Sequence, residues 1–297
     1  MGFFQKYTDK LFLKQWALGI AKGDIRELLQ KTNGELDFQW ITPKNKTQFY
    51  ADPFIIKTPD GLFHLFYEDI KQAEGYGKIA QFVFDDQMNL LKHGIILDEG
   101  IHMSYPFVIR EDKKVYIIPE ASRSGSLYAY EFDSSSAKLV NKRRILNQPI
   151  VDPTILKFKD KYWLFGSMKE SSNSSLYIFY ADDLFGNYTP HPKNPVKIGL
   201  QGSRPAGNFI KIDDIIYRPA QNCSSYYGKS VDIFRIISLT TNDYVETYHK
   251  TIIPSKNSKY NFALHTINGD SGIIVVDGLR RYWQPFRQFI RKIRSWI

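Results

Sequence analysis

Acidic residues of a type suited to acid–base chemistry recur at matching places along this chain of 297 residues. Asp52 and Asp152 each precede a proline, and Glu68 and Glu120 each follow a short apolar run. In glycosyl chemistry one carboxylate deprotonates the attacking hydroxyl or water, while a second protonates the leaving oxygen. Asp before Pro also braces turns, so a purely structural role for the two aspartates is the alternative.

Cationic and imidazole side chains supply candidate binding groups. Arg204 and Arg218 each precede a Pro-Ala pair, and two such arginines could clamp a phosphate or a carboxylate, or form salt bridges to the acids. His102 and His265 are candidates for acid–base groups or for donors to sugar hydroxyls, with packed structural histidines as the alternative. No short metal-ligand spacing occurs, so we predict no metal and no cofactor, and a nucleotide-sugar donor would enter as substrate.

A repeated pattern must position these residues. Pro53, Pro106, Pro153 and Pro205 recur at intervals of roughly 50 residues, and a weaker fifth copy follows. Each copy begins a short β-rich run, continues through a Gly or Asp turn into a second strand, and mostly adds a third. We therefore predict an all-β fold, a five-bladed β-propeller over residues 1–278, because five such units close a ring without long exposed edges. A β-sandwich is the alternative, but it gives no reason for a proline-anchored repeat.

The propeller register predicts where the site lies. The start of each first strand would face the central axis, and so would the end of each second strand. The residues predicted to be catalytic are Asp52, Glu120 and Asp152. The residues predicted to bind substrate are Glu68, His102, Tyr105, Arg204, Arg218, Gln221, His265 and Asp277.

The two ends of the chain carry separate expectations. Residues 15–21 read as a strand that closes the ring, and residues 25–31 as a short helical turn. Residues 279–297 are predicted to form a basic amphipathic helix, because aromatic and apolar residues fall near one face beside basic residues and no acidic ones. Such a helix suits an anionic membrane surface, with packing on the propeller rim as the alternative.

Charge and cysteine content limit the partners and the cellular compartment that we predict. The formal net charge is +9, but much of it belongs to residues 279–297, so the body is close to neutral and no nucleic-acid partner is predicted. A nucleic-acid binder acting through that basic segment is the weakest alternative. The single cysteine, Cys223, excludes an intramolecular disulfide and fits a reducing compartment. With no apolar run long enough for a signal peptide or membrane span, we expect a cytoplasmic protein, peripheral at the inner face of the membrane.

Taken in order, the motifs resemble one propeller domain. The segments that carry the resemblance are Ala51–Phe54, His102–Phe107, Ile118–Glu120, Val151–Pro153, Ser203–Gly207 and Tyr217–Gly228. They resemble the N-terminal domain of plant glucosamine inositolphosphorylceramide transferases, which is also found in bacterial envelope-glycan proteins. The resemblance covers roughly residues 45–280 and implies a role in cell-envelope polysaccharide or glycolipid biosynthesis.

A more distant similarity joins the chain to five-bladed glycosidases of the arabinanase, levansucrase and invertase type. It implies that Asp52 matches their blade-one aspartate and that Asp152 matches an aspartate of a later blade. Their general acid is a glutamate, whereas the blade-four position here is Gln221, so Glu120 or Glu68 would have to replace it. This departure argues against straightforward hydrolysis.

The function predicted from these residues is sugar transfer at the central pocket. Asp52 would act as base, Asp152 would position the acceptor or raise the pKa of a neighbour, and Glu120 would be the second acid–base group. Arg204 and Arg218 would bind a phosphate of the donor or lipid carrier. The alternatives are a glycoside hydrolase on the same residues and a non-catalytic glycan-binding propeller.

Overall fold

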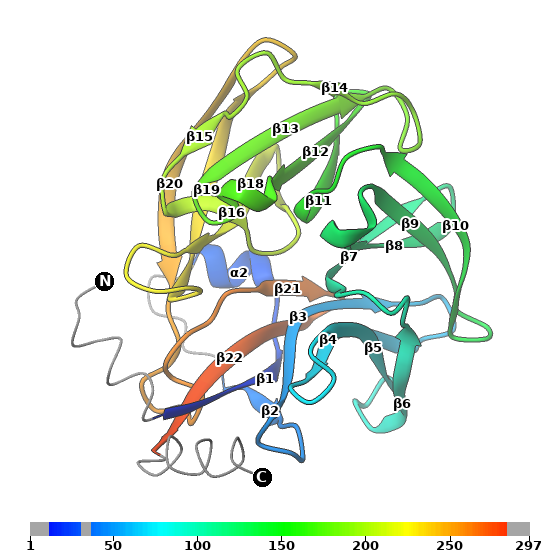
Figure 1. Ribbon diagram of the computed structural model, residues 1–297, viewed down its shortest axis with the longest axis vertical. Helices are drawn as coiled ribbons and strands as arrows, with labels where there is room; N and C mark the ends of the chain where they lie inside the picture. The colour runs from blue at the N-terminus through cyan, green and yellow to red at the C-terminus, as the bar shows by residue number, and fades with distance from the viewer. Residues whose placement is uncertain (1–11, 31–36, 284–297) are drawn as a thin grey trace, which may run out of the picture.

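Five antiparallel sheets surround a common axis in the computed structural model, which describes residues 12–30 and 37–283 (Figure 1). Blade one contains β3 (Gln48–Lys57), β4 (Phe63–Lys71), β5 (Gly77–Phe84) and β6 (Leu90–Leu97). Blade two contains β7 (Ser104–Glu111), β8 (Lys114–Glu120), β9 (Leu127–Asp133) and β10 (Lys138–Leu146), with the 3-10 turn Ser122–Ser124 between β8 and β9. The predicted all-β five-bladed propeller is confirmed.

Blades three and four each carry one extra short strand. Blade three contains β11 (Val151–Phe158), β12 (Lys161–Ser167), β13 (Ser175–Ala181), β14 (Thr189–Pro190) and β15 (Lys197–Ile198), with a 3-10 turn at Lys169–Ser171. Blade four contains β16 (Gln201–Pro205), β17 (Ile210–Ile212), β18 (Ile215–Asn222), β19 (Ser230–Leu239) and β20 (Tyr244–Ile252). In both blades the first strand lies innermost (Figure 1).

Blade five is assembled from both ends of the chain. It contains β21 (Ile267–Asp270), β22 (Ile273–Trp283), β1 (Phe12–Lys22) and β2 (Gln39–Ile41), in the order β2-β1-β22-β21. The full length of β1 pairs antiparallel with β22, as predicted for residues 15–21, and the helix α2 (Ile25–Gln30) follows it. This pairing closes the ring, because each strand satisfies the backbone hydrogen-bonding groups of the other.

The prediction of a helix from residue 279 onward is wrong for its first turn. Residues 279–283 are the end of β22, where Arg281 lies opposite Lys14 and Trp283 opposite Phe12. The backbone hydrogen bonds to β1 outweigh the local helical pattern, and Arg280 donates to Gln15 Oε1 at 3.1 Å. Residues 284–297 lie outside the described residues, so a membrane-binding helix there stays a prediction. Within 12–30 and 37–283 no helix is long and apolar enough to cross a membrane.

The proline repeat is a series of β-bulges. The pairing of first and second strands shifts register between Ala51 and Phe54, and at the equivalent places in blades two, three and four. Inside the first three bulges the residue before proline has a positive φ: 52° at Asp52, 44° at Tyr105 and 50° at Asp152. Proline suits this place because it has no N–H to leave unpaired where the ladder is interrupted. Bulges re-aim side chains, which explains why the repeat marks the axis.

Candidate functional site

One end of the propeller axis is lined by polar side chains from all five blades. We call this group the axial collar, and it consists of Asp52, Glu68, Glu120, Asp152, Arg204, Gln221, His265 and Asp277. All but Arg204 are buried, and the Arg204 side chain is 15% exposed. Contacts within the collar cross from blade to blade, so the ring itself builds the site.

Asp52 lies at the junction of blades one, two and five. Its Oδ2 accepts the N–H of Tyr105 at 3.2 Å, and its Oδ1 accepts the hydroxyl of Thr266 at 2.8 Å. The same Oδ1 lies 3.3 Å from Nε2 of His265. Burial raises the pKa of Asp52, His265 lowers it, and Asp152 and Asp277 raise it, for a value of about 6. Asp52 is therefore ionised at neutral pH but more basic than an exposed aspartate.

His265 bridges Asp52 and Asp277. Its Nδ1 lies 2.7 Å from Asp277 Oδ2 while its Nε2 faces Asp52. Asp277 is held in turn by the backbone N–H groups of His265, Thr266 and Asp52, at 2.9, 3.1 and 3.1 Å. Burial lowers the pKa of His265, but the two carboxylates more than compensate and raise it above its ordinary value. The three side chains form a relay in which the imidazole, more readily protonated than an ordinary histidine, lies between the two carboxylates.

The same three side chains offer ligand atoms within 4.8 Å of one another, a spacing that a metal ion could bridge. Each of those groups already takes part in the relay, so its geometry is explained without an ion. The absence of a metal stays a prediction.

Asp152 of blade three forms an ion pair with Arg204 of blade four. Arg204 contacts it through Nε and through Nη2, the latter at 3.2 Å, and Gln221 donates its amide at 3.0 Å. The remaining terminal nitrogen of Arg204 donates to Asn173 Oδ1 at 3.1 Å. The structure thus favours the salt-bridge alternative for Arg204, whose charge is matched by Asp152, and makes Asp152 a fixed anchor.

Glu120 has the opposite protonation state to Asp52 at neutral pH. Its Oε2 accepts the N–H of Asp152 at 3.3 Å, and its side chain is buried. Burial raises the pKa of Glu120, the negative charge of Asp152 adds to this effect, and the resulting value is about 8. A protonated carboxyl at pH 7 can donate a proton, so the collar contains a base and an acid.

Glu68 occupies a space that exists because residue 77 is glycine. A Cβ on Gly77 would lie 2.3 Å from Glu68 Oε1 and 2.6 Å from the carbonyl oxygen of Met103. Burial and the charges of Asp52, Glu120 and Asp152 hold the pKa of Glu68 well above its usual range. Glu68 is therefore a second carboxyl of the collar that holds its proton more tightly than an exposed glutamate does.

His102 lies beside Glu68, outside the collar. Its Nδ1 accepts the Gly77 N–H at 2.9 Å, which leaves Nε2 to carry a proton toward Glu68 Oε1, 3.4 Å away. Burial, with the charges of Arg123 and Arg204, lowers the pKa of His102. With 36% of its side chain exposed, His102 is open to solvent while the collar beside it is buried.

Tyr105 does not present its ring to substrate as predicted. The ring is fully buried against Phe54, and the hydroxyl bonds to Thr154 Oγ1 at 2.9 Å and accepts the Gly207 N–H at 2.7 Å. Because these partners belong to three other blades, Tyr105 packs across the ring and braces it. Only its backbone N–H serves the site, as the donor to Asp52.

Arg218 is not paired with Arg204. Its guanidinium donates from Nε and Nη2 to the two Glu246 oxygens at 2.8 and 2.7 Å, and Nη2 also donates to the Gly202 carbonyl at 2.6 Å. Burial alone would raise the pKa of Glu246, but Arg218 and Lys197 hold it down at about 2. The expected arginine clamp is therefore absent, and Arg218 belongs to a buried ion pair within blade four.

Replacing Arg218 by Met is expected to destabilise the protein by about 3 kcal/mol, because it removes one partner of a buried pair. Urea unfolding followed by circular dichroism measures this. The matched control is Lys157→Met, which breaks an exposed ion pair with Glu111 and should leave the midpoint unchanged. Equal midpoints for the Arg218 variant and wild type would show that the pair contributes nothing.

Sequence reasoning missed two aromatic residues beside His265. The ring of Trp16 lies 4.3 Å from the imidazole between centroids, and that of Tyr227 lies 5.3 Å from it. Trp16 comes from the strand that closes the ring, and Tyr227 from the loop after β18. The Tyr-Tyr-Gly sequence at 226–228 was the available signal, since a glycine there allows a loop to pack closely.

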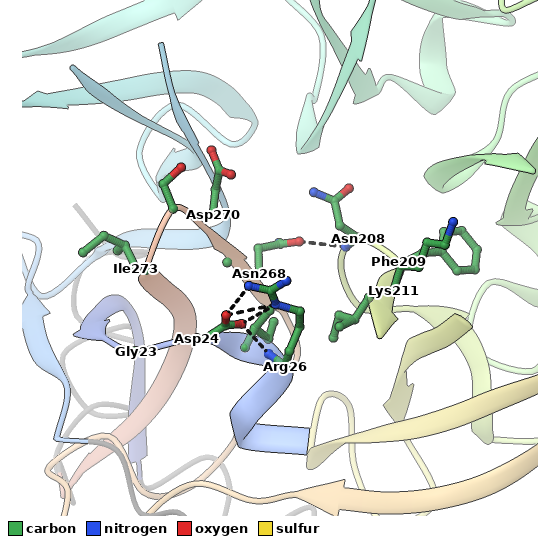
Figure 2. A pocket seen from close by; sticks show the side chains of 14 residues that line it. Gly23, Asp24, Arg26, Asn208, Phe209, Lys211, Asn268, Asp270 and Ile273 are labelled. Atoms are coloured by element: carbon green, nitrogen blue, oxygen red, sulfur yellow. Dashed lines mark hydrogen bonds and ion pairs between the residues drawn. The ribbon is translucent and has the colours of Figure 1, made fainter. Parts of the chain in front are cut away.

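The cavity in Figure 2 lies at the other end of the inner strands. It has a volume of about 360 Å³ and is lined by the start of α2, the turn between β21 and β22, and residues 208–211. Among its charged side chains, Asp24 is paired with Arg26 and Asp270 with Arg110, and Lys211 also lines it. The start of β21 adjoins the collar and its end lines this cavity, so the two sites are separate.

Solved structures similar to this chain include glycoside hydrolases. A family 117 glycoside hydrolase from the marine bacterium Zobellia galactanivorans is 13% identical, with a TM-score of 0.55, over 93% of this chain and 92% of that one. A thermostable family-43 glycoside hydrolase is 15% identical, with a TM-score of 0.53, over 77% of this chain and 85% of that one. At such identities the similarity shows the propeller fold alone.

Sequence comparison identifies nearer relatives. Glucosamine inositolphosphorylceramide transferase 1 from Arabidopsis thaliana is 33% identical over 207 residues, which are 67% of this chain and 27% of that protein. Its counterpart from Oryza sativa subsp. japonica is 30% identical over 207 residues, 67% of this chain and 28% of that protein. The chain thus spans little more than a quarter of these relatives. The family model described as glucosamine inositolphosphorylceramide transferase 1, N-terminal, matches residues 40–269, and the chain belongs to this family.

Proposed function

We propose that the axial collar transfers a sugar to an acceptor hydroxyl during the synthesis of an envelope polysaccharide or glycolipid. The observation that carries the proposal is the pairing of opposite protonation states in one ring. Asp52 is ionised at neutral pH with a pKa of about 6, and Glu120 is protonated with a pKa of about 8. General acid–base catalysis works best when the pKa values of the two groups lie on either side of the working pH.

The reaction can be written on these groups. Asp52 accepts the proton of the acceptor hydroxyl as that oxygen bonds to the anomeric carbon of the donor sugar. The bond from the anomeric carbon to the leaving oxygen breaks, and Glu120 gives that oxygen its proton. His265, held by Asp277, stabilises the Asp52 carboxylate before the proton is taken. Asp152 and Arg204 keep the Glu120 side of the ring in place.

Two features favour transfer over hydrolysis. The relatives that match two thirds of the chain are named as transferases. The blade-four collar position holds Gln221, whose amide cannot protonate a leaving group and instead donates to Asp152 and to the Pro205 carbonyl. The collar therefore lacks an acid at the place where the resembling glycosidases have one.

Hydrolysis is the second candidate, because the same base and acid would serve it with water as the acceptor. The propeller architecture that this chain shares with glycoside hydrolases is compatible with hydrolysis.

The test is a screen of purified protein with nucleotide sugars and an extract of lipid-linked glycans, read by mass spectrometry beside Asp52→Asn. We expect a product heavier by one sugar that the variant does not form. Shortened glycans would assign hydrolysis instead. Unchanged glycans in both samples would contradict catalysis and leave glycan binding as the function.

A further inference from the structure

The loop between β18 and β19, residues 223–229, packs onto blade five at the collar. The Gly228 carbonyl accepts the Leu264 N–H at 3.0 Å. Gly228 has a φ of 65°, and a Cβ there would lie 2.7 Å from His265 Cβ and 3.4 Å from the Trp16 ring. Glycine is required on both counts, so this loop is built to lie directly against the relay histidine.

Tyr227, next in this loop, presents an open aromatic surface beside buried collar groups. Its side chain is 42% exposed, whereas His265 and Asp52 are 3% and 6% exposed. The edge-to-face contact with His265 and the Arg204 guanidinium, 5.2 Å from the ring centroid, fix the ring in place. Among the described residues no hydrogen-bond partner is found for its hydroxyl. The Tyr227 ring is held in place with an exposed surface, so a sugar ring could stack on it and form a hydrogen bond with its hydroxyl.

The charges near this ring leave little to attract an anion. Arg204 is matched by Asp152, and the imidazole of His265 lies between two carboxylates. Partial loss of solvation beside the buried collar raises the pKa of Tyr227, so its phenol stays neutral. A ligand carboxylate at this place would meet Asp52 without a free collar cation to balance it.

We propose that Tyr227 is the stacking platform for a sugar ring at the collar, and that this subsite takes an uncharged or amino-bearing sugar and excludes a sugar acid. The proposal deepens the proposed function and rests on it for the assignment of the collar to carbohydrate. Stacking on Tyr227 places the ring next to Asp52 and His265, where its hydroxyls meet the relay.

Saturation-transfer NMR titrations with four probes test this: methyl glucoside, methyl galactoside, glucosamine and glucuronate. We expect at least one uncharged or amino sugar to bind saturably, and glucuronate to bind at least about tenfold more weakly. Tyr227→Ala should weaken the binding about tenfold, as loss of an aromatic contact does. Tyr227→Phe should stay within about twofold of wild type, because it keeps the ring.

The control is Tyr248→Ala, which removes a 54%-exposed tyrosine on β20 and should leave binding unchanged. Saturable binding by none of the three uncharged or amino sugars, equal binding of glucuronate, or an equal loss in the Tyr248 variant would overturn the proposal. Asp52→Asn separates it from the proposed function. Binding that persists in this variant while wild type shows no turnover would keep the platform and contradict sugar transfer.

Discussion

The Asp52→Asn variant is expected to lose sugar transfer by about 10²–10⁴-fold, the range that a general base contributes. Asn is isosteric and its carbonyl oxygen can still accept one of the hydrogen bonds from Thr266 and Tyr105. It cannot take a proton from an acceptor hydroxyl. Initial rates under saturating donor measure the loss, and urea unfolding checks that the fold is retained.

The matched control is Asp232→Asn, a fully buried aspartate of blade four outside the collar. It bonds to Asn222 and Thr251, so its loss costs hydrogen bonds of the same kind. We expect its turnover to remain within a few fold of wild type under conditions where it is folded. An Asp52 variant as active as the Asp232 variant would show that Asp52 has only a structural role.

The Glu120→Gln variant is expected to lose about 10²–10⁴-fold with donors whose leaving oxygen is strongly basic, and to lose little with an aryl donor that needs no protonation. The side-chain carbonyl of Gln can still accept the Asp152 N–H, so the packing is preserved. Rates with an alkyl and a nitrophenyl glycoside donor, each compared with wild type, give the result.

This selective rescue distinguishes an acid from a merely structural residue. If the Glu120 variant loses equally with both donors, the carboxyl holds the site together and does not donate a proton. A Glu68→Gln variant measured beside it tests the other collar carboxyl with a raised pKa, and a rescue seen there instead would move the acid role to Glu68.

The proline repeat allows most of the fold and about half of the collar residues to be predicted from the sequence, because it has a structural cause. A β-bulge interrupts the hydrogen-bond ladder and so tolerates proline inside a strand, and Pro53, Pro106 and Pro153 mark the bulges of the first three blades. Once the register of one blade is set, the others follow. That register predicts Asp52, Asp152, Arg204 and His265 around one opening, and the structure adds the contacts of Asp52 with His265 and of Asp152 with Arg204.

The misplaced residues depend on side-chain direction, which the repeat does not encode. Arg218 and Gln221 are three positions apart on β18, and alternation along a strand puts them on opposite faces. Gln221 accordingly reaches the axis while Arg218 binds Glu246. Tyr105 shares the bulge position of Asp52, but its longer side chain reaches across the core to Thr154.

Two further features depend on contacts distant in sequence. Residues 279–283 carry a mixed apolar and basic pattern that fits a strand or a helix over so short a length, and only pairing with β1 decides it. Tyr227 lies in a loop, where no periodicity exists, and its place beside His265 follows from the packing of Gly228.

The pH dependence of transfer by wild-type protein tests the central claim most directly. Asp52 must be ionised, so the rate should rise with pH through about 6; Glu120 must be protonated, so the rate should fall through about 8. The account predicts a bell-shaped profile of kcat/KM between these values, and loss of the alkaline limb in Glu120→Gln. A profile that is flat from about pH 5 to about pH 9, or an alkaline limb that survives in that variant, would contradict it.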